Sequence, residues 1–297
     1  MKFFITGGTG FVGRNIIQTL IGNGNEVIAT GRSSLHPIRV TDNFTYLSCD
    51  TSHKGSWQKS IEQCDVVINL AGESIIGRWS AKTREKIYNS RIKTTSNIVS
   101  VMDSGQALIS ASASGIYGDR GDDVLDEKAK SGTGFLADVC VDWEGEAFSA
   151  KDGVRVAVFR LGVVLGRGGG VIDKMKTPFK LGIGGRLGSG KQWFPWIHID
   201  DVINALIFLS NEDMCSGIFN FSAPEQVTNE FFTKEFAKSL NVRAIIPVSS
   251  MGIKLLLGES ASVLLSSQKM IPSRLIEMKY SFKYPVLSES LAVVADN

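Results

Sequence analysis

The residues best placed to do chemistry are glycines near the start of the sequence, because their spacing is typical of loops that bind a dinucleotide. They are Gly7, Gly8, Gly10 and Gly13. Residues 3–6 predict a short buried strand before them, and residues 14–22 show the apolar spacing of a helix after them. This order of strand, glycine turn and helix favours a binding loop. An ordinary strand–helix turn is the alternative, but such a turn needs only one or two glycines.

Each glycine has a mechanical role if the loop binds a pyrophosphate. Gly7 and its neighbour allow a tight turn, Gly10 lets the backbone approach the phosphates, and Gly13 lets the helix pack closely on the strand. The first N–H groups of the helix, at Phe11 and Val12, would face the phosphates because they have no partner within the helix. We therefore predict that Gly7, Gly10, Phe11, Val12 and Gly13 contact the cofactor.

Arg32 follows the predicted second strand, residues 26–30, where a dinucleotide-binding fold meets the adenosine ribose. An acidic residue here binds the ribose hydroxyl of NAD, whereas an arginine accommodates the 2′-phosphate of NADP. The guanidinium suits a phosphate because it is planar and always charged. The sequence therefore predicts NADP(H) as the cofactor, with Arg39 as a weaker second contact. A solvated loop arginine is the alternative.

Two further segments end predicted parallel strands on the same edge of the sheet. Asp50 closes the third strand, and Leu70, Ala71 and Gly72 follow the fourth. Ligands of open α/β sheets bind outside the carboxyl ends of the strands, so both segments are predicted to contact the cofactor. Asp50 could accept a hydrogen bond from the adenine amino group, and equally could cap the turn at residues 51–52.

Three charged side chains are predicted to line the cofactor groove or the cleft beside it. They are Glu73, Arg91 and Arg160. Glu73 follows the fourth strand and Arg91 lies in the helical stretch after it. Arg160 ends a later predicted strand and could reach a phosphate or a substrate carboxylate. A salt bridge at the surface is the alternative for Arg160.

Several longer motifs resemble a known superfamily. The segments Gly7–Gly13, Asn69–Gly72, Ser110–Gly118 and Trp196–Asp201 are similar to extended short-chain dehydrogenases/reductases of the nucleotide-sugar epimerase type. Other segments resemble its atypical epimerase-family branch, which carries an additional C-terminal domain. They are Ala71–Glu73, Arg78–Trp79, Phe135–Ala137, Trp143–Glu144, Leu161–Gly170 and Gly188–His198. The resemblance covers essentially the whole chain, and it implies NADP binding in a Rossmann domain with a substrate cleft beside it.

The resemblance also implies a catalytic Tyr-x-x-x-Lys pair, which this sequence lacks. None of the five tyrosines has a lysine four residues further on. At the corresponding place stand Phe135 or Leu136 for the tyrosine and Cys140 for the lysine. Leucine has no proton to give, and a thiol with a pKa of about 8.5 offers no positive charge at neutral pH. The missing Tyr-x-x-x-Lys pair puts the family's reaction in doubt, but it does not affect the prediction that the chain binds NADP(H).

Ser112 and Tyr117 are the residues predicted to act in place of the missing pair. Ser112, with Ser114 nearby, ends the predicted strand 107–112, where a superfamily serine polarises a substrate oxygen; a turn serine is the alternative. The phenol of Tyr117 is an acid suited to carbonyl chemistry, although packing in the cleft wall would explain it as well. The acidic pair at residues 126–127 is a weaker candidate, since such pairs in loops are usually solvated.

Composition and charge limit the partners. Hydrophobic residues make up 43% and charged residues 21% of the chain, as in soluble globular proteins. A net charge of +2 predicts neither nucleic acid nor an anionic membrane as a partner, and no apolar run approaches the ~20 residues of a membrane span. The four cysteines lack metal or disulfide spacing, so we expect no metal. A strand beginning at residue 3 leaves no room for a targeting segment, which predicts a cytoplasmic protein.

Strands and helices alternate up to about residue 165, which predicts an α/β Rossmann fold with a doubly wound parallel sheet. We expect residues 1–165 to form the NADP-binding domain, with its sheet completed by residues 196–222. Residues 166–195 and 223–297 are expected to form a smaller α/β domain on the substrate side, including a C-terminal module at 243–294 with a helix over residues 260–269.

Two functions remain open on the sequence. The first is an NADP(H)-dependent oxidoreductase or epimerase acting on a carbonyl or sugar-type small molecule. The second is a non-catalytic NADPH-binding sensor or scaffold, which the missing Tyr-x-x-x-Lys pair favours. The sequence is also compatible with a homodimer that pairs through the long helices of the Rossmann domain.

Overall fold

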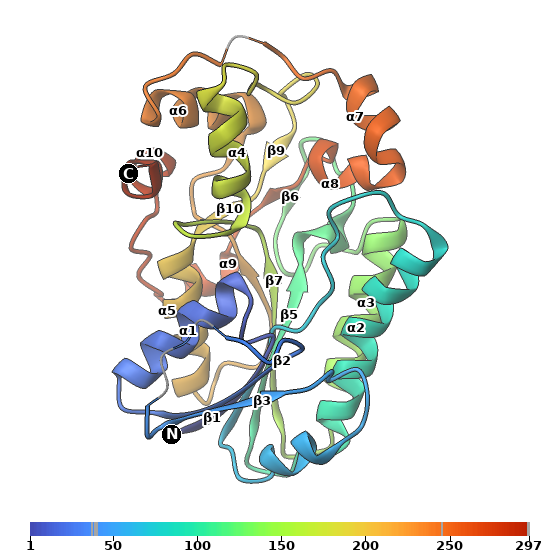
Figure 1. The fold of residues 1–297 in the computed structure, drawn as a ribbon, viewed down its shortest axis with the longest axis vertical. Coiled ribbons are helices and arrows are strands. Elements are labelled where there is room, and N and C mark those ends of the chain that lie inside the picture. The colour runs from blue at the N-terminus through green and yellow to red at the C-terminus, as the bar shows by residue number, and fades with distance from the viewer. Residues whose placement is uncertain (37, 39–40, 245, 296–297) are drawn as a thin grey trace.

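The computed structural model describes residues 1–36, 38, 41–244 and 246–295. Within this part of the chain, parallel strands form one seven-stranded sheet (Figure 1). From one edge to the other they are β11 (Gly217–Phe221), β7 (Arg155–Leu161), β5 (Ala107–Ala113), β4 (Val66–Asn69), β1 (Lys2–Thr6), β2 (Glu26–Gly31) and β3 (Phe44–Ser48). The strand order reverses between β1 and β4, and a crevice outside the carboxyl ends forms at such a reversal. The predicted Rossmann fold is confirmed.

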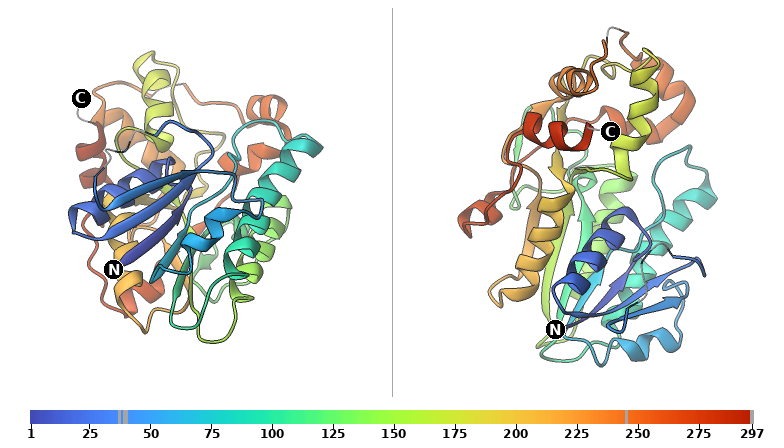
Figure 2. Two further views of the ribbon diagram at one scale, coloured as in Figure 1. Left: turned by 60° about the horizontal axis from the view of Figure 1, so that its bottom comes forward. Right: turned by 60° about the vertical axis from the view of Figure 1, so that its left-hand side comes forward.

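Helices cover both faces of the sheet because its strands are apolar on both sides. One face carries α1 (Phe11–Gly22) and α5 (Ile199–Asn211), and the other carries α2 (Ala81–Val99) and α3 (Phe135–Phe148) (Figures 1 and 2). Side chains of β1 alternate between the two cores. Phe3 and Ile5 join the cluster under α1 and α5, while Phe4 joins the cluster under α2 and α3.

A smaller lobe lies above the carboxyl ends of the strands (Figure 1). Its short strands are β6 (Val124–Leu125), β8 (Val163–Leu165), β9 (Trp193–Phe194), β10 (Trp196–His198), β12 (Val227–Thr228) and β13 (Lys269–Met270). Its helices and those at its border are α4 (Gly170–Lys180), α6 (Asn229–Ser239), α7 (Ser250–Leu257), α8 (Ser262–Leu265), α9 (Ser273–Glu277) and α10 (Leu287–Ala295). Single 3₁₀ turns are η1 (Ser56–Ser60), η2 (Ser114–Tyr117) and η3 (Gly258–Ala261). Trp196, Phe232 and Leu291 belong to a separate core inside this lobe.

One predicted helix is wrong in extent. The sequence predicts a helix over residues 260–269, but α8 ends at Leu265 and the chain continues as strand β13. The N–H of Ser267 donates to the Asp119 carboxylate at 2.9 Å, and the Ser267 hydroxyl donates to the carbonyl of Gly121. These contacts, made 146–148 residues apart in sequence, hold the segment extended, and no local pattern encodes them.

His198 and the start of α5 fasten the C-terminal segment to the sheet. The His198 ring accepts a hydrogen bond from the N–H of Asp200 and so caps α5. It also packs on the ring of Tyr284 at 4.0 Å between centroids. The Asp201 carboxylate accepts from the N–H groups of Lys283 and Tyr284. Burial lowers the pKa of His198 to about 4, against the attraction of Asp200.

Acid is expected to destabilise the protein through His198. Unfolded chains take up a proton at this ring near pH 6.5, whereas the folded ring stays neutral down to about pH 4. Stability from this group is complete above pH 6.5 and falls as the pH drops towards 4, by about 2–3 kcal/mol. Urea unfolding at pH 7.0, 5.5 and 4.5 measures the loss. His198→Asn keeps a capping oxygen and should flatten the profile, whereas His53→Asn, at an exposed ring, should not. An unchanged slope in His198→Asn would contradict the assignment.

Candidate functional site

The glycine loop joins β1 to α1 at the carboxyl edge of the sheet. Gly7 has a φ of +68°, and its carbonyl accepts from the N–H of Gly10 at 2.9 Å, which closes the turn. A Cβ on Gly7 would lie 2.7 Å from the carbonyl oxygen of Leu70. A Cβ on Gly13 would lie 2.3 Å from the carbonyl oxygen of Gly7. The loop therefore tolerates no side chain at either position. The first N–H groups of α1, at Phe11 and Val12, have no acceptor within the helix and leave an anion cradle.

The segment Leu70–Glu73, which follows β4, is held against this loop from behind. The hydroxyl of Thr6 donates to Asn69 at 2.7 Å and accepts from the N–H groups of Leu70 and Ala71. Arg91, on α2, donates from both terminal nitrogens to the carbonyl of Glu73 at 3.1 Å. Its guanidinium also lies over the ring of Trp143. A Cβ on Gly72 would come within 3.1 Å of that guanidinium, so a glycine fits there.

Arg32 and Glu73 meet across the mouth of the groove. The Nη1 atom of Arg32 lies 2.8 Å from Oε2 of Glu73. Because of this hydrogen bond, the pKa of Glu73 is lowered and its carboxylate stays charged. The Arg32 side chain is 66% exposed, so its other N–H groups remain open to a ligand. The structure thus brings the ends of β2 and β4 together at the predicted cofactor site, and Arg39 lies outside the described residues.

Asp50 caps a turn at the end of β3. Its Oδ1 accepts from the N–H of Ser52 at 3.0 Å and from the Ser52 hydroxyl at 2.7 Å. Burial raises the pKa of Asp50, but these hydrogen bonds outweigh it and the net shift is downward. Asp50 therefore caps the turn with Oδ1, as the alternative interpretation predicted. Half of its side chain remains exposed to solvent. A shallow groove of about 420 Å³ runs past it, lined among others by Tyr46, Cys49 and Trp57.

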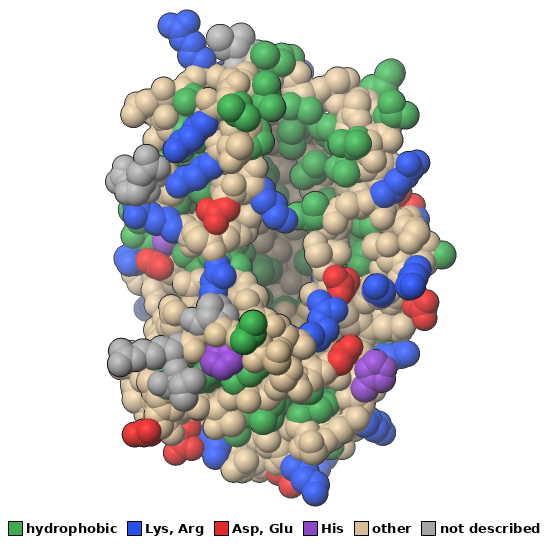
Figure 3. Space-filling view, viewed as in Figure 1, with side chains coloured by type: hydrophobic (Ala, Val, Ile, Leu, Met, Phe, Trp, Pro, Cys, Tyr) green, Lys and Arg blue, Asp and Glu red, His purple; other side chains and the backbone are tan. Residues whose placement is uncertain are grey.

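A hollow opens above the glycine loop between the two lobes. Figure 3, viewed as Figure 1, shows it between α4 on one side and the α2–α7 side of the molecule on the other. Lysine and arginine side chains border its lower half, where the carboxyl ends of the strands lie. Hydrophobic side chains gather in its upper half, under the smaller lobe. This division separates a charged cofactor end from an apolar end.

Arg160 lies at the centre of a buried polar network behind the hollow. Its Nε donates to Oε1 of Glu144, on α3, and its Nη2 donates to Oε2 of the same residue, both at 2.8 Å. Its Nη1 atom donates to the hydroxyl of Tyr117 at 2.9 Å, and Glu144 also accepts from the hydroxyl of Ser112 at 2.6 Å. The Tyr117 hydroxyl lies 2.7 Å from Oδ1 of Asn220, on β11. Strands β5, β7 and β11 and helix α3 are therefore joined by one set of hydrogen bonds.

Burial in this network does not favour the predicted roles of Ser112, Tyr117 and Arg160. All three side chains are at most 5% exposed, and each is fully engaged with protein groups. Burial raises the pKa of Tyr117, although Arg160 and Asn220 oppose this shift. The alternative interpretation of Arg160 was a salt bridge at the surface. Arg160 does form an ion pair, with Glu144, but this pair is buried in the interior. Sequence reasoning missed Glu144, whose position within a helix carries no local sign of its partners.

The place of the missing catalytic pair contains no acid or base. Leu136 lies against the end of β5, 3.4 Å from where a side chain at Gly115 would begin. Burial raises the pKa of Cys140 to about 11, so the thiol stays protonated and neutral. Ser114, at the start of η2, is the half-buried hydroxyl beside them. It has no side-chain hydrogen bond within the described part of the chain, unlike Ser112.

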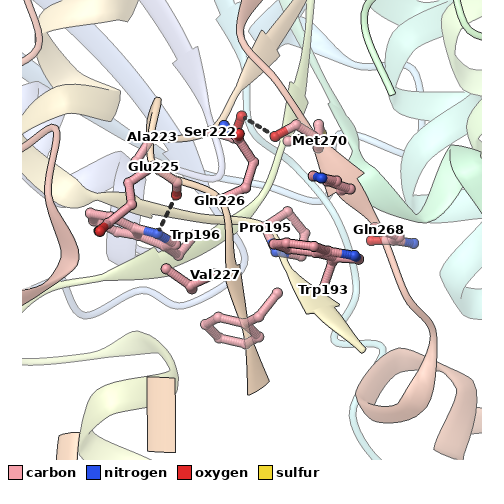
Figure 4. A pocket seen from close by; sticks show the side chains of 12 residues that line it. Trp193, Pro195, Trp196, Ser222, Ala223, Glu225, Gln226, Val227, Gln268 and Met270 are labelled. Carbon is pink, nitrogen blue, oxygen red and sulfur yellow. Dashed lines mark hydrogen bonds between the residues drawn. The ribbon is translucent and has the colours of Figure 1, made fainter. Parts of the chain in front are cut away.

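The aromatic segment 193–196 packs the smaller lobe. Trp196 donates to the carbonyl of Glu225, and Trp193 lies under the ammonium of Lys269 at 4.2 Å (Figure 4). The gap between these side chains, Ser222 and Met270 is too narrow for a water molecule. The segment therefore serves packing. Among the described residues there is no cluster of three potential metal ligands, and no helix there is long and apolar enough to cross a membrane.

A glycine cradle at the strand reversal of a parallel sheet, with a second lobe over it, defines a dinucleotide-binding protein of the Rossmann class. More particularly, the chain belongs to the NAD dependent epimerase/dehydratase family, whose model matches residues 3–221. A second model, a domain of unknown function (DUF1731), matches residues 248–294.

Relatives cover the whole chain. Epimerase family protein SDR39U1 of Mus musculus is 35% identical over 300 residues, covering 98% of both chains. Its chloroplastic homolog in Arabidopsis thaliana is 35% identical over 99% of this chain and 86% of the relative. The crystal structure of human SDR39U1 with NADPH superposes with a TM-score of 0.89 at 31% identity over all of both chains. A UDP-glucuronic acid 4-epimerase from Bacillus cereus, at 17% identity and a TM-score of 0.81, shares the fold.

Proposed function

We propose that this protein binds NADP(H) and acts as an oxidoreductase or epimerase on a small carbonyl compound. The predicted contacts are Gly7, Gly10, Phe11, Val12, Gly13, Arg32, Asp50, Leu70, Ala71, Gly72 and Glu73. Arg91 then positions the segment Leu70–Glu73 and does not contact the cofactor itself. The NADPH bound to human SDR39U1 supports this choice of cofactor.

The observation that carries the proposal is the exposed guanidinium of Arg32 at the end of β2. The residues that directly follow β2 include no acid, and Glu73, from the β4 loop, holds the guanidinium through one hydrogen bond. The remaining donors suit the doubly charged 2′-phosphate that distinguishes NADPH from NADH. The side-chain-free cradle at Gly7 and Gly13 suits the pyrophosphate.

Arg32→Ala is expected to weaken NADPH binding by about 10- to 100-fold, because a charge-assisted contact is worth about 1.5–3 kcal/mol. NADH affinity should stay within about twofold, since NADH has no 2′-phosphate. Fluorescence titration with both nucleotides measures this, with Arg243→Ala, in the smaller lobe away from the glycine loop, as the control. Equal NADPH affinity in Arg32→Ala and wild type would contradict the role of Arg32.

NADPH supplies a hydride when bound, and the chain must orient the acceptor and handle the proton. Ser114 is the residue we propose for polarising the substrate oxygen, because its hydroxyl bonds to no group of the described residues and follows the last residue of β5. Leu136 has no proton to give, and the neutral thiol of Cys140 cannot supply the positive charge of the lysine in a Tyr–Lys pair. We therefore propose that a water molecule provides the proton that the substrate oxygen takes up when hydride adds to the carbonyl carbon.

Oxidation of NADPH by a panel of aldehydes and ketones tests catalysis directly. Loss of absorbance at the nicotinamide band with one of them, reduced in Ser114→Ala, supports an enzyme. Tight NADPH binding with no oxidation by any of them supports the non-catalytic alternative, a sensor or scaffold.

We further propose the division into an NADP-binding domain, residues 1–165 completed by 196–222, and a substrate-side region made of the rest. The participation of β11 in the main sheet supports this division. Cytoplasmic location, a small-molecule partner in place of nucleic acid or a membrane, and a homodimer are proposals that rest on the sequence.

A further inference from the structure

Six exposed hydrophobic side chains lie on two segments of the smaller lobe, and together they are called the apolar rim here. They are Leu181, Ile183, Ile246, Met251, Leu255 and Leu256, from 56% exposed (Ile246) to 82% exposed (Leu255). The first two follow α4, and the last three belong to α7. So much exposed apolar surface in one region is uncommon unless a ligand or partner covers it.

The two segments of the apolar rim lie side by side. Backbone hydrogen bonds join Val248 to Arg186 and Gly188 to Val248, each at 2.8 Å. A Cβ on Gly185 would overlap the carbonyl oxygen of Ile246 at 1.8 Å, so the chains touch at the backbone. The two segments that carry the rim are therefore neighbours in the fold. Figure 1 shows α4 and α7 on opposite sides of the smaller lobe, and in the same view Figure 3 shows a hollow between them with hydrophobic side chains gathered around its upper half.

Most arginines on elements around the hollow already bond to a group of the protein. Those that bond to backbone carbonyls or carboxylates are Arg14 (Gly168), Arg84 (Glu259), Arg91 (Glu73), Arg160 (Glu144) and Arg186 (Gly188 and Ser189). A diphosphate is best held by free, bidentate guanidinium groups. Arg78 is the exposed arginine that bears no such bond within the described residues.

We propose that the substrate is an apolar carbonyl compound, an alkyl or aryl ketone or aldehyde, whose hydrocarbon part lies on the apolar rim. Its oxygen points down the hollow towards Ser114 at the end of β5. A nucleoside diphosphate sugar is expected to bind more weakly than such a compound, because the exposed side chains of the rim are hydrocarbon and cannot pair with a diphosphate. This inference rests on the proposed function, since the carbonyl must meet NADPH.

A homologous series tests it: 2-butanone, 2-hexanone, 2-octanone and 2-decanone, titrated into the NADPH-loaded protein, beside UDP-glucose. Each added methylene that becomes buried should tighten binding about two- to fourfold. In Leu255→Asp/Leu256→Asp the factor by which each methylene tightens binding should fall to about one, so that chain length no longer affects affinity. Both side chains are exposed, so the variant is expected to fold. Met214→Asp, an equally exposed residue between α5 and β11, at the opposite end of the sheet, should keep the wild-type increment.

Three results would overturn the inference. They are tighter binding of UDP-glucose than of every ketone, an increment that survives in Leu255→Asp/Leu256→Asp, and conversion of a dimer to a monomer by that variant in sedimentation. The last result would make the rim an interface between two copies. NADPH affinity is measured first in each protein. Failure of NADPH to bind the wild type would refute the proposed function, whereas failure at the rim alone leaves it intact.

Discussion

Glu144→Gln is expected to lower the free energy of unfolding by about 3–5 kcal/mol, because it leaves the buried guanidinium of Arg160 without its counter-charge. Both side chains of this pair are nearly inaccessible, at 6% and 8% exposure. Arg160 cannot relieve the loss by releasing its proton, because an arginine guanidinium keeps its charge in proteins. The amide that replaces the carboxylate would also present an N–H group to Arg160 or Ser112, which are both donors.

Urea unfolding at pH 7 measures this loss. Asp103→Asn serves as the control, because the ion pair of Asp103 with Lys151 is mostly exposed and should contribute less than about 1 kcal/mol. The double variant Glu144→Leu/Arg160→Met should recover part of the loss, since apolar replacement of a buried ion pair is often neutral. A loss below about 1 kcal/mol in Glu144→Gln would show that water reaches the network.

Locally encoded features of the site could be predicted from the sequence. The glycine loop needs only a strand, four glycines and a helix in succession, and Arg32 needs only its place after β2. The β4 loop was predictable for the same reason, because Leu70 follows a run of buried residues. Each depends on neighbours within a few residues, where propensity and spacing act.

The polar network could not be predicted, because its members come from five elements, including β5 with Ser112. Glu144 is on α3, Tyr117 on η2, Arg160 on β7 and Asn220 on β11. Strand pairing sets Arg160 beside both Ser112 and Asn220, and this register depends on the complete sheet. The family resemblance of the Trp143–Glu144 motif draws attention to Glu144, but it does not indicate that Arg160 is its partner.

Alternation along β5 bears on the predicted role of Ser112. Side chains two residues apart point to one face of a sheet, so Leu108, Ser110 and Ser112 share a face. That face carries α2 and α3, and Ser110 is bonded there to Asn69. The strand runs to Ala113, one residue beyond its predicted end, so Ser112 lies within the sheet and Ser114 is the first serine beyond it.

Gly13→Ala is expected to weaken NADPH binding by at least about 100-fold. The new Cβ would lie 2.3 Å from the carbonyl oxygen of Gly7 and 2.9 Å from the Cα of Gly8, and both are backbone atoms. Relief requires α1 to move away from the loop, which misplaces the N–H groups that face the pyrophosphate. Losing two such charge-assisted hydrogen bonds, at about 1.5–3 kcal/mol each, accounts for the size of the effect.

Gly22→Ala is the matched control within the same helix. A Cβ there meets nothing within 4 Å, and alanine is the better helix former, so stability should rise by up to about 1 kcal/mol. NADPH affinity should then equal that of the wild type. Titration together with thermal unfolding separates the two outcomes, since Gly13→Ala must lose affinity beyond any loss of folded protein. Wild-type affinity in folded Gly13→Ala would mean that the cofactor does not depend on the close packing of α1 against Gly7, and the cradle would have to lie elsewhere on the carboxyl edge.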